Sequence, residues 1–504
     1  MANILGISAS LRNARFGKGS EDLCNDLRTL TDREALEGYL KAQSKIRFED
    51  FYEAGRDKNL SFDHIYENLQ KSRGDQGLSN SEAALAAGLW GALQKGAEIS
   101  HLGLSSYFRA NGSVRNMDEL REHILKADGI LLSGPVYFGD RGSLAQNFIE
   151  FIREDDACRE HLEGKVYGGI AVGAKRNGGQ ETTLIYQMVD MTNLNMLAVG
   201  NDSATTSQYG GTAVAGDVGT LPSDEYGINT CIGTGRRIAH VCNLIESSKE
   251  SDLRDKVNIA IWLLQDTEDH HGKQLMRELC DDIEKQAPFI NFEILDFTDE
   301  QIYRCIACDI CPISVGESDE YRCIISSKSD LFVNEHTNIL EPDGVLLAAY
   351  SPKDRQDIKS VYQKFIERTR YIRRDDYRFT DLLGAPFVIS EVGSNQNLHI
   401  RMITSYIRHH TIMHHPFIGI EHEGKLLDRE SLVQKGVEFA HNAKKLTIGR
   451  LKAPSVAAQE VAYNPIGYQI SLEKSELDRK AANADELHDA IDQAHINKRS
   501  RLVG

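Results

Sequence analysis

The stretch "ADGILLSGP" at residues 127–135 has a close parallel in "PDGVLLAAYSP" at residues 342–352. In each, an Asp-Gly pair precedes an apolar run about as long as one strand, which is typical of strands buried in parallel sheets. A helix-like segment follows in both places, "NFIEFIRE" at 147–154 and "KFIERTRY" at 364–371. The parallel indicates a weak internal duplication of an α/β unit.

Apolar, β-branched runs alternate with longer amphipathic segments on both sides of these stretches, as in doubly wound α/β proteins. The first half is expected to have five strands, at residues 3–8, 98–104, 129–134, 167–174 and 195–200. The second half is expected to have five more, at residues 257–264, 291–297, 344–350, 386–393 and 411–420. The predicted fold class is therefore α/β, with two doubly wound domains that each contain a five-stranded parallel sheet.

A chain of 504 residues exceeds one ordinary hydrophobic core. We expect a first domain at 1–250 with an insertion at about 31–95, a second domain at 251–453, and a charged, helical C-terminal extension at 454–504. Within the insertion, residues 81–93 are predicted to form a helix with Ser81 as its N-cap.

Charge and hydropathy exclude several classes of partner. With 58 Lys and Arg against 75 Asp and Glu, the net charge of -17 disfavours nucleic-acid binding. The longest apolar runs, at 129–134 and 259–264, are too short to cross a bilayer, so no membrane partner is expected. The opening "MANILGISAS" lacks the basic start and apolar core of a secretory signal, which predicts a cytoplasmic protein.

Three loops that follow predicted strands are suited to a ligand. "SASLRNARFGKGSEDL" (8–23) offers hydroxyls, Arg12 and a helix start to a phosphate. "SGPVYFGDRG" (133–142) places two aromatic residues between Pro and Gly, where they can form flat walls for a planar ring. "GAKRNGGQETTL" (173–184) leaves backbone N–H groups free just before a helix. Any one of them is typical of an ordinary connection, but three in register predict a site at the carboxyl ends of the strands.

Through "GISASLR", "GPVYFG" and "GGQETT", the first half resembles the flavodoxin-like NAD(P)H-dependent FMN reductase family. The third loop also resembles that of flavodoxin-like quinone oxidoreductases. The resemblance covers most of residues 2–245 apart from the insertion, while the Gly-rich segment at 207–220 has no counterpart. It implies flavodoxin-like domains, FMN as the cofactor and NAD(P)H as an electron donor. It places the FMN phosphate near Ser8, Ser10, Arg12, Asn13 and Ser20. One side of the isoalloxazine would face Pro135, Val136, Tyr137, Phe138 and Gly139. The other side would face Gly178, Gly179, Gln180 and Glu181.

The corresponding loop of the second half is acidic. Asp266, Glu268 and Asp269 stand where the first half has Ser and Arg, and their carboxylates would repel a phosphate. One flavin per chain is therefore expected. The neighbouring His270 and His271, and the four histidines of "RHHTIMHHPF" (408–417), are interpreted as ordinary polar residues rather than as metal ligands.

The stretch "YRCIACDICP" (303–312) begins a cysteine motif, C-x2-C-x2-C-x11-C, which consists of Cys305, Cys308, Cys311 and Cys323. Structural zinc sites usually pair two separated knuckles, whereas three close cysteines and a distant fourth are common for a [4Fe-4S] cluster. Zinc and unmetallated thiols remain alternatives. The motif also resembles that of the iron-sulfur flavoproteins, in which it follows the second strand. The five other cysteines are interpreted as small buried residues: Cys24, Cys158, Cys231, Cys242 and Cys280.

The predicted function is that of an FMN-dependent oxidoreductase. It would pass electrons between NAD(P)H or a reduced carrier such as ferredoxin, the FMN of the first domain and a [4Fe-4S] cluster lying beside that flavin across the interface of the halves. The expected partners are a small-molecule or redox-protein donor and acceptor, and a homodimer is left open. No residue is nominated as a catalytic acid or base. The alternatives are an NAD(P)H:quinone or flavin reductase with a structural zinc or no metal, and a non-enzymatic flavodoxin-like scaffold.

Overall fold

The computed structural model describes residues 1–11, 18–56, 58–71, 77–205, 208–250, 256–307, 323–351, 358–373, 379–393 and 397–452. The C-terminal extension expected at 454–504 lies outside these residues. Among the described helices, none combines the length and the apolar character needed to cross a membrane.

The strands occur in both halves of the chain. Those of the first half are β1 (Asn3–Ser8), β2 (Glu98–Gly103), β3 (Gly129–Tyr137), β4 (Asp140–Arg141), β5 (Val166–Gly173), β6 (Leu197–Ala198) and β7 (Gly211–Val214). Those of the second half are β8 (Val257–Leu263), β9 (Ile290–Asp296), β10 (Gly344–Ser351), β11 (Leu383–Glu391), β12 (Ile412–Met413), β13 (Phe417–His422) and β14 (Lys425–Leu426).

Helices separate most of the strands. The α-helices of the first half are α1 (Lys18–Thr29), α2 (Arg33–Phe51), α3 (Phe62–Lys71), α4 (Asn80–Leu93), α5 (Met117–Leu125), α6 (Ser143–Glu154), α7 (Asp156–Leu162), α8 (Gln180–Asn193) and α9 (Glu225–Ser247). Those of the second half are α10 (His271–Gln286), α11 (Leu331–Asn334), α12 (His336–Leu340), α13 (Ile358–Arg368), α14 (Arg370–Arg373), α15 (Leu398–Tyr406) and α16 (Arg429–Lys452). Short helical turns include η3 (Ser203–Thr205) and η4 (Leu221–Ser223).

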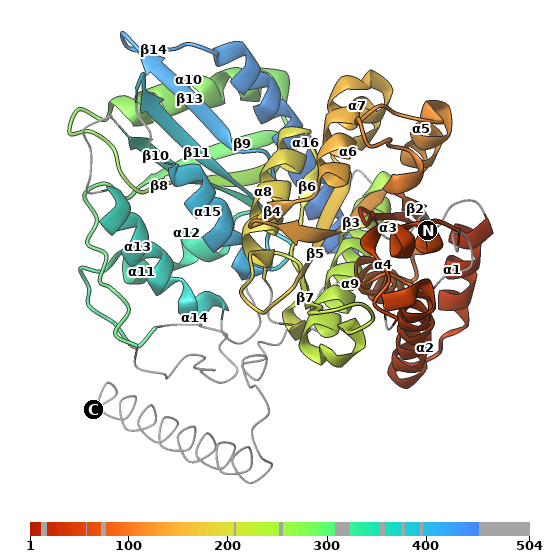
Figure 1. Ribbon diagram of the computed structural model, residues 1–504. Coiled ribbons are helices and arrows are strands. Elements are labelled where there is room, and N and C mark those ends of the chain that lie inside the picture. The colour runs from red at the N-terminus through yellow and green to blue at the C-terminus, as the bar shows by residue number, and fades with distance from the viewer. Residues whose placement is uncertain are drawn as a thin grey trace.

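All main strands belong to one mostly parallel sheet that runs through both halves (Figure 1). Its order is β2-β1-β3-β5-β6-β12-β11-β10-β8-β9. Successive residues of a strand face opposite sides, so that Leu131 of β3 belongs to one hydrophobic cluster while Ile130 and Leu132 belong to the other. Each cluster draws residues from both halves. The halves therefore share two continuous cores, one on each face of the sheet.

Two short strands follow the fourth main strand of each half, which corrects the simple five-stranded layout: β7 adds to the strand expected at 195–200, and the strand expected at 411–420 is divided into β12 and β13. In the first half, β6 and β7 both pair in parallel with β5, and η3 lies between them. In the second half, β12 and β13 both pair in parallel with β11. Pro416 lies between these two strands and lacks the N–H that a continuous ladder would require.

The two halves meet where β6 pairs with β12, and this pairing is antiparallel, with Ala198 opposite Met413. The parallel strands of the two halves consequently run in opposite directions, and their carboxyl ends lie at opposite edges of the sheet. The cysteine motif follows β9, and β5 leads into the third predicted flavin loop. Six strand intervals, or roughly 30 Å, separate these two strands in the sheet. The expectation that the cysteine motif lies beside the flavin site of the same chain is therefore wrong.

A buried ion pair stabilises the contact between β6 and β12, which we call the joint. Arg237 of α9 pairs with Asp381, which precedes β11, and both side chains are 1% exposed. Arg237 also donates to the carbonyl oxygen of His410 at 2.7 Å, and His240 contacts the second oxygen of Asp381 at 2.8 Å. Burial alone would raise the pKa of Asp381, but His240 and Arg237 hold that pKa well below its usual value. The carboxylate therefore stays charged inside the joint.

The four histidines of the 408–417 stretch are buried on either side of β12. His415 crosses the joint, where its Nδ1 donates to the carbonyl oxygen of Thr192 at 3.0 Å. Burial lowers the pKa of His409 and of His414 to about 3 and the pKa of His415 to about 4, and it lowers the pKa of His410 as well. These histidines are packed as neutral rings.

Removing the carboxylate of the joint should cost stability. Asp381→Ala leaves the Arg237 guanidinium buried without its counter-charge, so the free energy of unfolding should fall by about 3–5 kcal/mol. Urea denaturation of the full chain measures the loss. The matched control is Asp118→Ala, because Asp118 pairs with Arg121 at 2.8 Å but its side chain is 98% exposed. Equal losses for the two variants would contradict a special role for the joint.

Acid should destabilise the protein through the same region. The folded pKa values of these four histidines lie below the unfolded value of about 6.5, so below that pH only the unfolded chain takes up their protons. Between pH 6.5 and 4, the free energy of unfolding should therefore fall by up to about 1.4 kcal/mol per pH unit for each histidine. Urea denaturation at pH 7 and pH 5 tests this, and His414→Gln should weaken the dependence. A free energy that stays constant over this range would refute it.

Candidate functional site

A cavity of about 360 Å³ opens at the carboxyl-terminal edge of the first half, where doubly wound sheets bind their ligands. Its volume is within the usual range of ligand pockets. Five segments that end strands, follow strands or begin a helix form most of its wall, and Arg47 of α2 adds to it. The lining residues are Ser10, Leu11, Arg47, Ser79, Asn80, Ser81, Pro135, Val136, Tyr137, Val172, Gly173, Ala174, Ala215, Val218 and Gly219.

Helix α4 begins at this cavity. Its sequence is rich in Ala and Leu on all sides, so the helix is buried along nearly its whole length. Ser79 caps it: the Ser79 hydroxyl accepts from the backbone N–H of Glu82 at 3.3 Å, and the Glu82 carboxylate accepts from the N–H of Ser79 at 3.5 Å. This capping box corrects the predicted cap at Ser81, and its signal is the S-x-x-E pattern at 79–82. The positive end of the helix dipole faces the cavity and favours an anion there.

The structure separates the predicted phosphate residues. Ser10 lines the cavity, and Ser8 ends β1, fully buried, with no hydrogen-bond partner for its hydroxyl among the described residues. Ser20 is not among the lining residues; its hydroxyl contacts Nδ1 of the buried His101 at 3.0 Å, and Nε2 of His101 lies 3.6 Å from the Glu82 carboxylate of α4. The sequence interpretation missed the start of α4, which supplies Ser79, Asn80 and Ser81. Two predicted residues lie outside the described part of the chain, Arg12 and Asn13.

The predicted ring loop continues β3 and turns back into β4. Pro135, Val136 and Tyr137 line the cavity, whereas Phe138 is fully exposed. Phe138 has a φ of 53°, a positive value that the two-residue turn between β3 and β4 requires. The next residue, Gly139, also has a positive φ and packs against the third loop. Three of the five residues predicted to contact the ring therefore reach the cavity wall.

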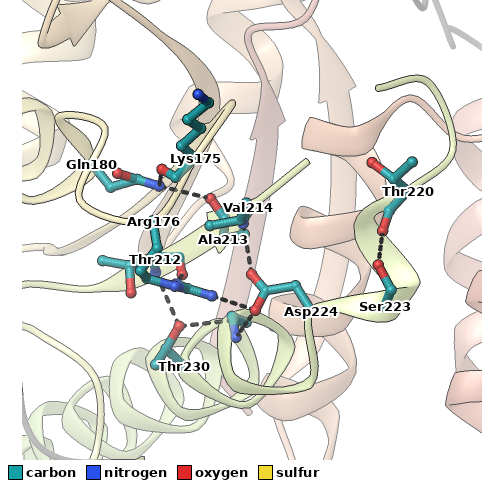
Figure 2. Close-up of polar contacts among 11 residues, drawn as sticks. Lys175, Arg176, Gln180, Thr212, Ala213, Val214, Thr220, Ser223, Asp224 and Thr230 are labelled. Carbon is teal, nitrogen blue, oxygen red and sulfur yellow. Dashed lines mark hydrogen bonds and ion pairs between the residues drawn. The ribbon is translucent and has the colours of Figure 1, made fainter. Parts of the chain in front are cut away.

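The third loop begins in the cavity wall with Gly173 and Ala174, and its later residues are held by a buried amide. Gln180 donates to the carbonyl oxygens of Lys175 at 2.8 Å and Ala213 at 3.3 Å (Figure 2). Its own amide oxygen accepts from the N–H of Gly178 at 2.8 Å. A Cβ at Gly179 would lie 2.7 Å from the Cα of Gly139, so this position requires glycine. None of the four residues predicted here, 178–181, lines the cavity. Gln180 is a positioning residue, and Gly173 and Ala174 form the wall instead.

The Gly-rich segment 207–220, which has no counterpart in the resemblance, forms β7 and the loop that completes the cavity. Asp224, the N-cap residue of α9, binds this segment through the N–H of Val214 at 2.6 Å (Figure 2). The same carboxylate accepts from the N–H of Gly227 at 3.0 Å. Asp224 also pairs with Arg176, whose guanidinium donates to the carbonyl oxygen of Thr212 at 2.6 Å. The network links the third loop, β7 and the N-terminus of α9.

In the second half, the carboxylate of Asp266 binds the start of the helix that follows the first strand. Asp266 follows β8, is 1% exposed, and accepts from the backbone N–H groups of Thr267 at 2.7 Å, Gly272 at 2.9 Å and Lys273 at 2.7 Å. Gly272 and Lys273 belong to the first turn of α10. The Asp266 carboxylate therefore occupies the helix N-terminus that an anionic ligand would otherwise use.

Two of the four predicted cluster ligands are described, Cys305 and Cys323, and both are partly exposed. The two ends of the segment that carries these cysteines are held together by a buried ion pair, in which Arg368 binds Asp330 at 2.6 Å. Arg368 also donates to the carbonyl oxygen of Tyr303 at 3.0 Å, and Asp330 accepts from the N–H of Tyr303 at 3.2 Å. In the described part of the chain, no group of three or more potential ligands surrounds a metal position. Two predicted ligands lie outside that part, Cys308 and Cys311.

The five other cysteines are buried and unpaired with one another, as predicted. Burial raises the pKa of the Cys24 thiol to about 11 and of the Cys158 thiol to about 12. Both thiols are therefore protonated at neutral pH and are poor nucleophiles.

We expect the Gln180 side chain to stabilise the folded protein. Gln180→Ala leaves the N–H of Gly178 and the carbonyl oxygen of Ala213 without their side-chain partner, so the free energy of unfolding of the flavin-free protein should fall by about 1–3 kcal/mol. The adjacent Glu181→Ala, an exposed position on the same helix, should change it little. Urea denaturation of both variants measures the difference. If Gln180→Ala matched the wild-type stability, the amide would have no anchoring role.

Comparison with known proteins places this site in a family. The model of the family described as NADPH-dependent FMN reductase matches residues 78–210, a range that includes α4, which had been assigned to the insertion. An iron-sulfur flavoprotein of Methanocaldococcus jannaschii is 36% identical over 133 residues, which cover 26% of this chain and 68% of that protein.

Two further relatives are similar to part of the chain. An iron-sulfur flavoprotein of Methanosarcina thermophila is 32% identical over 138 residues, with 27% of this chain and 66% of that protein covered. An NAD(P)H dehydrogenase (quinone) of Caulobacter vibrioides is 30% identical over 129 residues, with 23% and 64% covered. The chain thus spans about two thirds of each relative. It belongs to the family of flavodoxin-like FMN reductases and iron-sulfur flavoproteins.

Proposed function

We propose that this oxidoreductase binds FMN in the cavity of its first half and transfers electrons between NAD(P)H or a reduced carrier and an acceptor. The supporting observation is the cavity itself, whose wall combines hydroxyl groups and a helix N-terminus with the Pro135–Tyr137 segment. A flavin mononucleotide has the matching polarity, with a phosphate at one end and a planar ring at the other.

The phosphate end is built from donors. The hydroxyls of Ser10, Ser79 and Ser81 line the cavity where α4 starts, and the Asn80 amide, which donates to the carbonyl oxygen of Asp217 at 2.9 Å, has a second N–H. The buried Ser8 hydroxyl, with no partner among the described residues, is a further donor beside them. Arg12 would add a charge-assisted contact, as the family resemblance implies. This donor set suits a phosphate monoester.

The ring end is apolar and partly open. Val136 and Val172 lie in its wall, and Tyr137 is 48% exposed. Bound FMN would exchange two electrons with a nicotinamide and single electrons with a carrier. The chain's own contribution would be to hold the ring at the carboxyl ends of β3 and β5 and to leave one edge accessible to the donor. We nominate no side chain for proton transfer.

We further propose that each half is a flavodoxin-like domain, at residues 1–250 and 251–453, and that only the first binds flavin. The strand order within each half is 2-1-3-4-5 when its strands are numbered from its own start, which is the flavodoxin order. The Asp266 carboxylate at the start of α10 supports the single site, because it would repel a phosphate at close range.

The cysteine loop is the proposed site of a [4Fe-4S] cluster. Two relatives are named iron-sulfur flavoproteins, and Cys305 follows the second strand of its half, β9. Because the antiparallel joint separates this loop from the flavin cavity, direct electron transfer between them within one chain is not part of the proposal. A diffusing carrier or a second copy of the chain would connect the two sites. The cytoplasm remains the proposed location.

A second candidate function is reduction of a quinone by NAD(P)H without use of a cluster. The Caulobacter relative, named a quinone-dependent NAD(P)H dehydrogenase, favours it. The half-exposed Tyr137 at the open edge would leave room for a flat acceptor against the flavin.

Cofactor content distinguishes the two candidates. The full chain purified without oxygen should carry one FMN and about four iron atoms per chain. Cys308→Ser should remove the iron while FMN binding persists, because the cavity shares no residue with the cysteine loop. Flavin absorbance together with iron and zinc analysis measures both. FMN without iron would favour the quinone reductase, a second FMN would refute the single site, and a colourless protein would refute both functions.

A further inference from the structure

The insertion that precedes the family match contributes to the cavity. Helix α2 lies in this part of the chain and is capped by Asp32, whose carboxylate accepts from the N–H of Ala35 at 2.9 Å. The helix packs against α4 and against η4, which follows the β7 loop. It therefore bridges two of the segments that form the wall.

This packing is tight enough to depend on glycine. A Cβ at Gly77 would lie 2.0 Å from the carbonyl oxygen of Gln43 and 2.6 Å from the backbone nitrogen of Arg47. A Cβ at Gly219, where φ is +73°, would lie 2.7 Å from the carbonyl oxygen of Ser44. The backbone of α2 thus touches the segments on both sides of the cavity, and its position there is fixed.

Arg47 is the residue through which α2 reaches the cavity. It is 5% exposed and shares the wall with Ser10, Ser79 and Ser81. By contrast, the side chain of Lys45 in the same helix is 76% exposed on the surface. Among the described residues that line the cavity, Arg47 carries a positive charge and none carries a negative charge.

The charge and the hydroxyls select a ligand class. A guanidinium binds a phosphate through charge-assisted, often bidentate hydrogen bonds, and a nearby helix N-terminus adds to the attraction. A neutral alcohol at the same position gains neither effect. A flavin that ends in a phosphate should therefore be preferred over the same flavin that ends in a hydroxyl.

We infer that Arg47 binds the terminal phosphate of FMN, so that the insertion makes the enzyme selective for FMN over riboflavin and retains FMN as a resident cofactor. This inference rests on the proposed function, because it assumes that FMN occupies the cavity. It adds a phosphate contact from a segment outside the matched residues 78–210.

The test compares two flavins that differ in the phosphate. The flavin-free full chain is titrated with FMN and with riboflavin, and binding is followed by quenching of flavin fluorescence. Arg47→Gln should weaken FMN binding about 10- to 100-fold and riboflavin binding less than about threefold, because only FMN offers the charge that is lost. Arg47→Lys, which keeps the charge but not the fork, should give an intermediate loss. The matched control, Lys45→Gln, should change neither.

Any of the following results would contradict the inference. Equal weakening of FMN and riboflavin by Arg47→Gln would show a structural role, and unchanged FMN binding would show no role. If Arg47→Gln did not fold, the ratio of the FMN to the riboflavin dissociation constant in Arg47→Lys would decide in the same way. A wild-type chain that binds neither flavin would refute the proposed function itself, which separates that failure from a failure of the Arg47 assignment alone.

Discussion

The antiparallel contact of β6 with β12 determines how the rest of the molecule is arranged. Two sheets of the same order are joined edge to edge there, and the pairing reverses the strand direction from one half to the other. The buried Arg237–Asp381 pair stabilises the contact from a helix of the first half to the start of a strand of the second. Because both hydrophobic clusters continue across this line, the halves share their cores and are positioned as one body.

The joint also has a consequence for electron flow. In an open α/β sheet, ligands bind beyond the carboxyl ends of the strands. With the strand directions reversed, the cavity proposed for the flavin and the loop after β9 lie at opposite edges. The two proposed redox sites of one chain would then face different partners, as expected of a protein that meets a carrier or another copy of itself rather than of one with an internal relay.

Two helix N-termini show how the same local physics gives opposite results. Helix α4 starts at the cavity with Ser79, Asn80 and Ser81, all neutral donors or acceptors. Helix α10 starts with its first-turn N–H groups bound to the Asp266 carboxylate. The electrostatic preference for an anion is common to both. An external phosphate is expected at the first helix, while the chain's own carboxylate meets the same preference at the second.

The sequence by itself determined the strands at 3–8, 257–263 and 344–351 to within a residue, because a buried apolar run of strand length depends on little beyond local hydropathy. It also located the Pro135–Tyr137 wall, since aromatic, Pro and Gly residues at a strand end are a local pattern. The tertiary structure alone decided that Gln180 anchors a loop, that Ser79 rather than Ser20 stands at the cavity, and that Arg47 reaches it from the insertion. It also decided the reversal of strand direction at the joint. Each of these depends on contacts between residues far apart in the chain, and local patterns carry no information about which distant segments pack together.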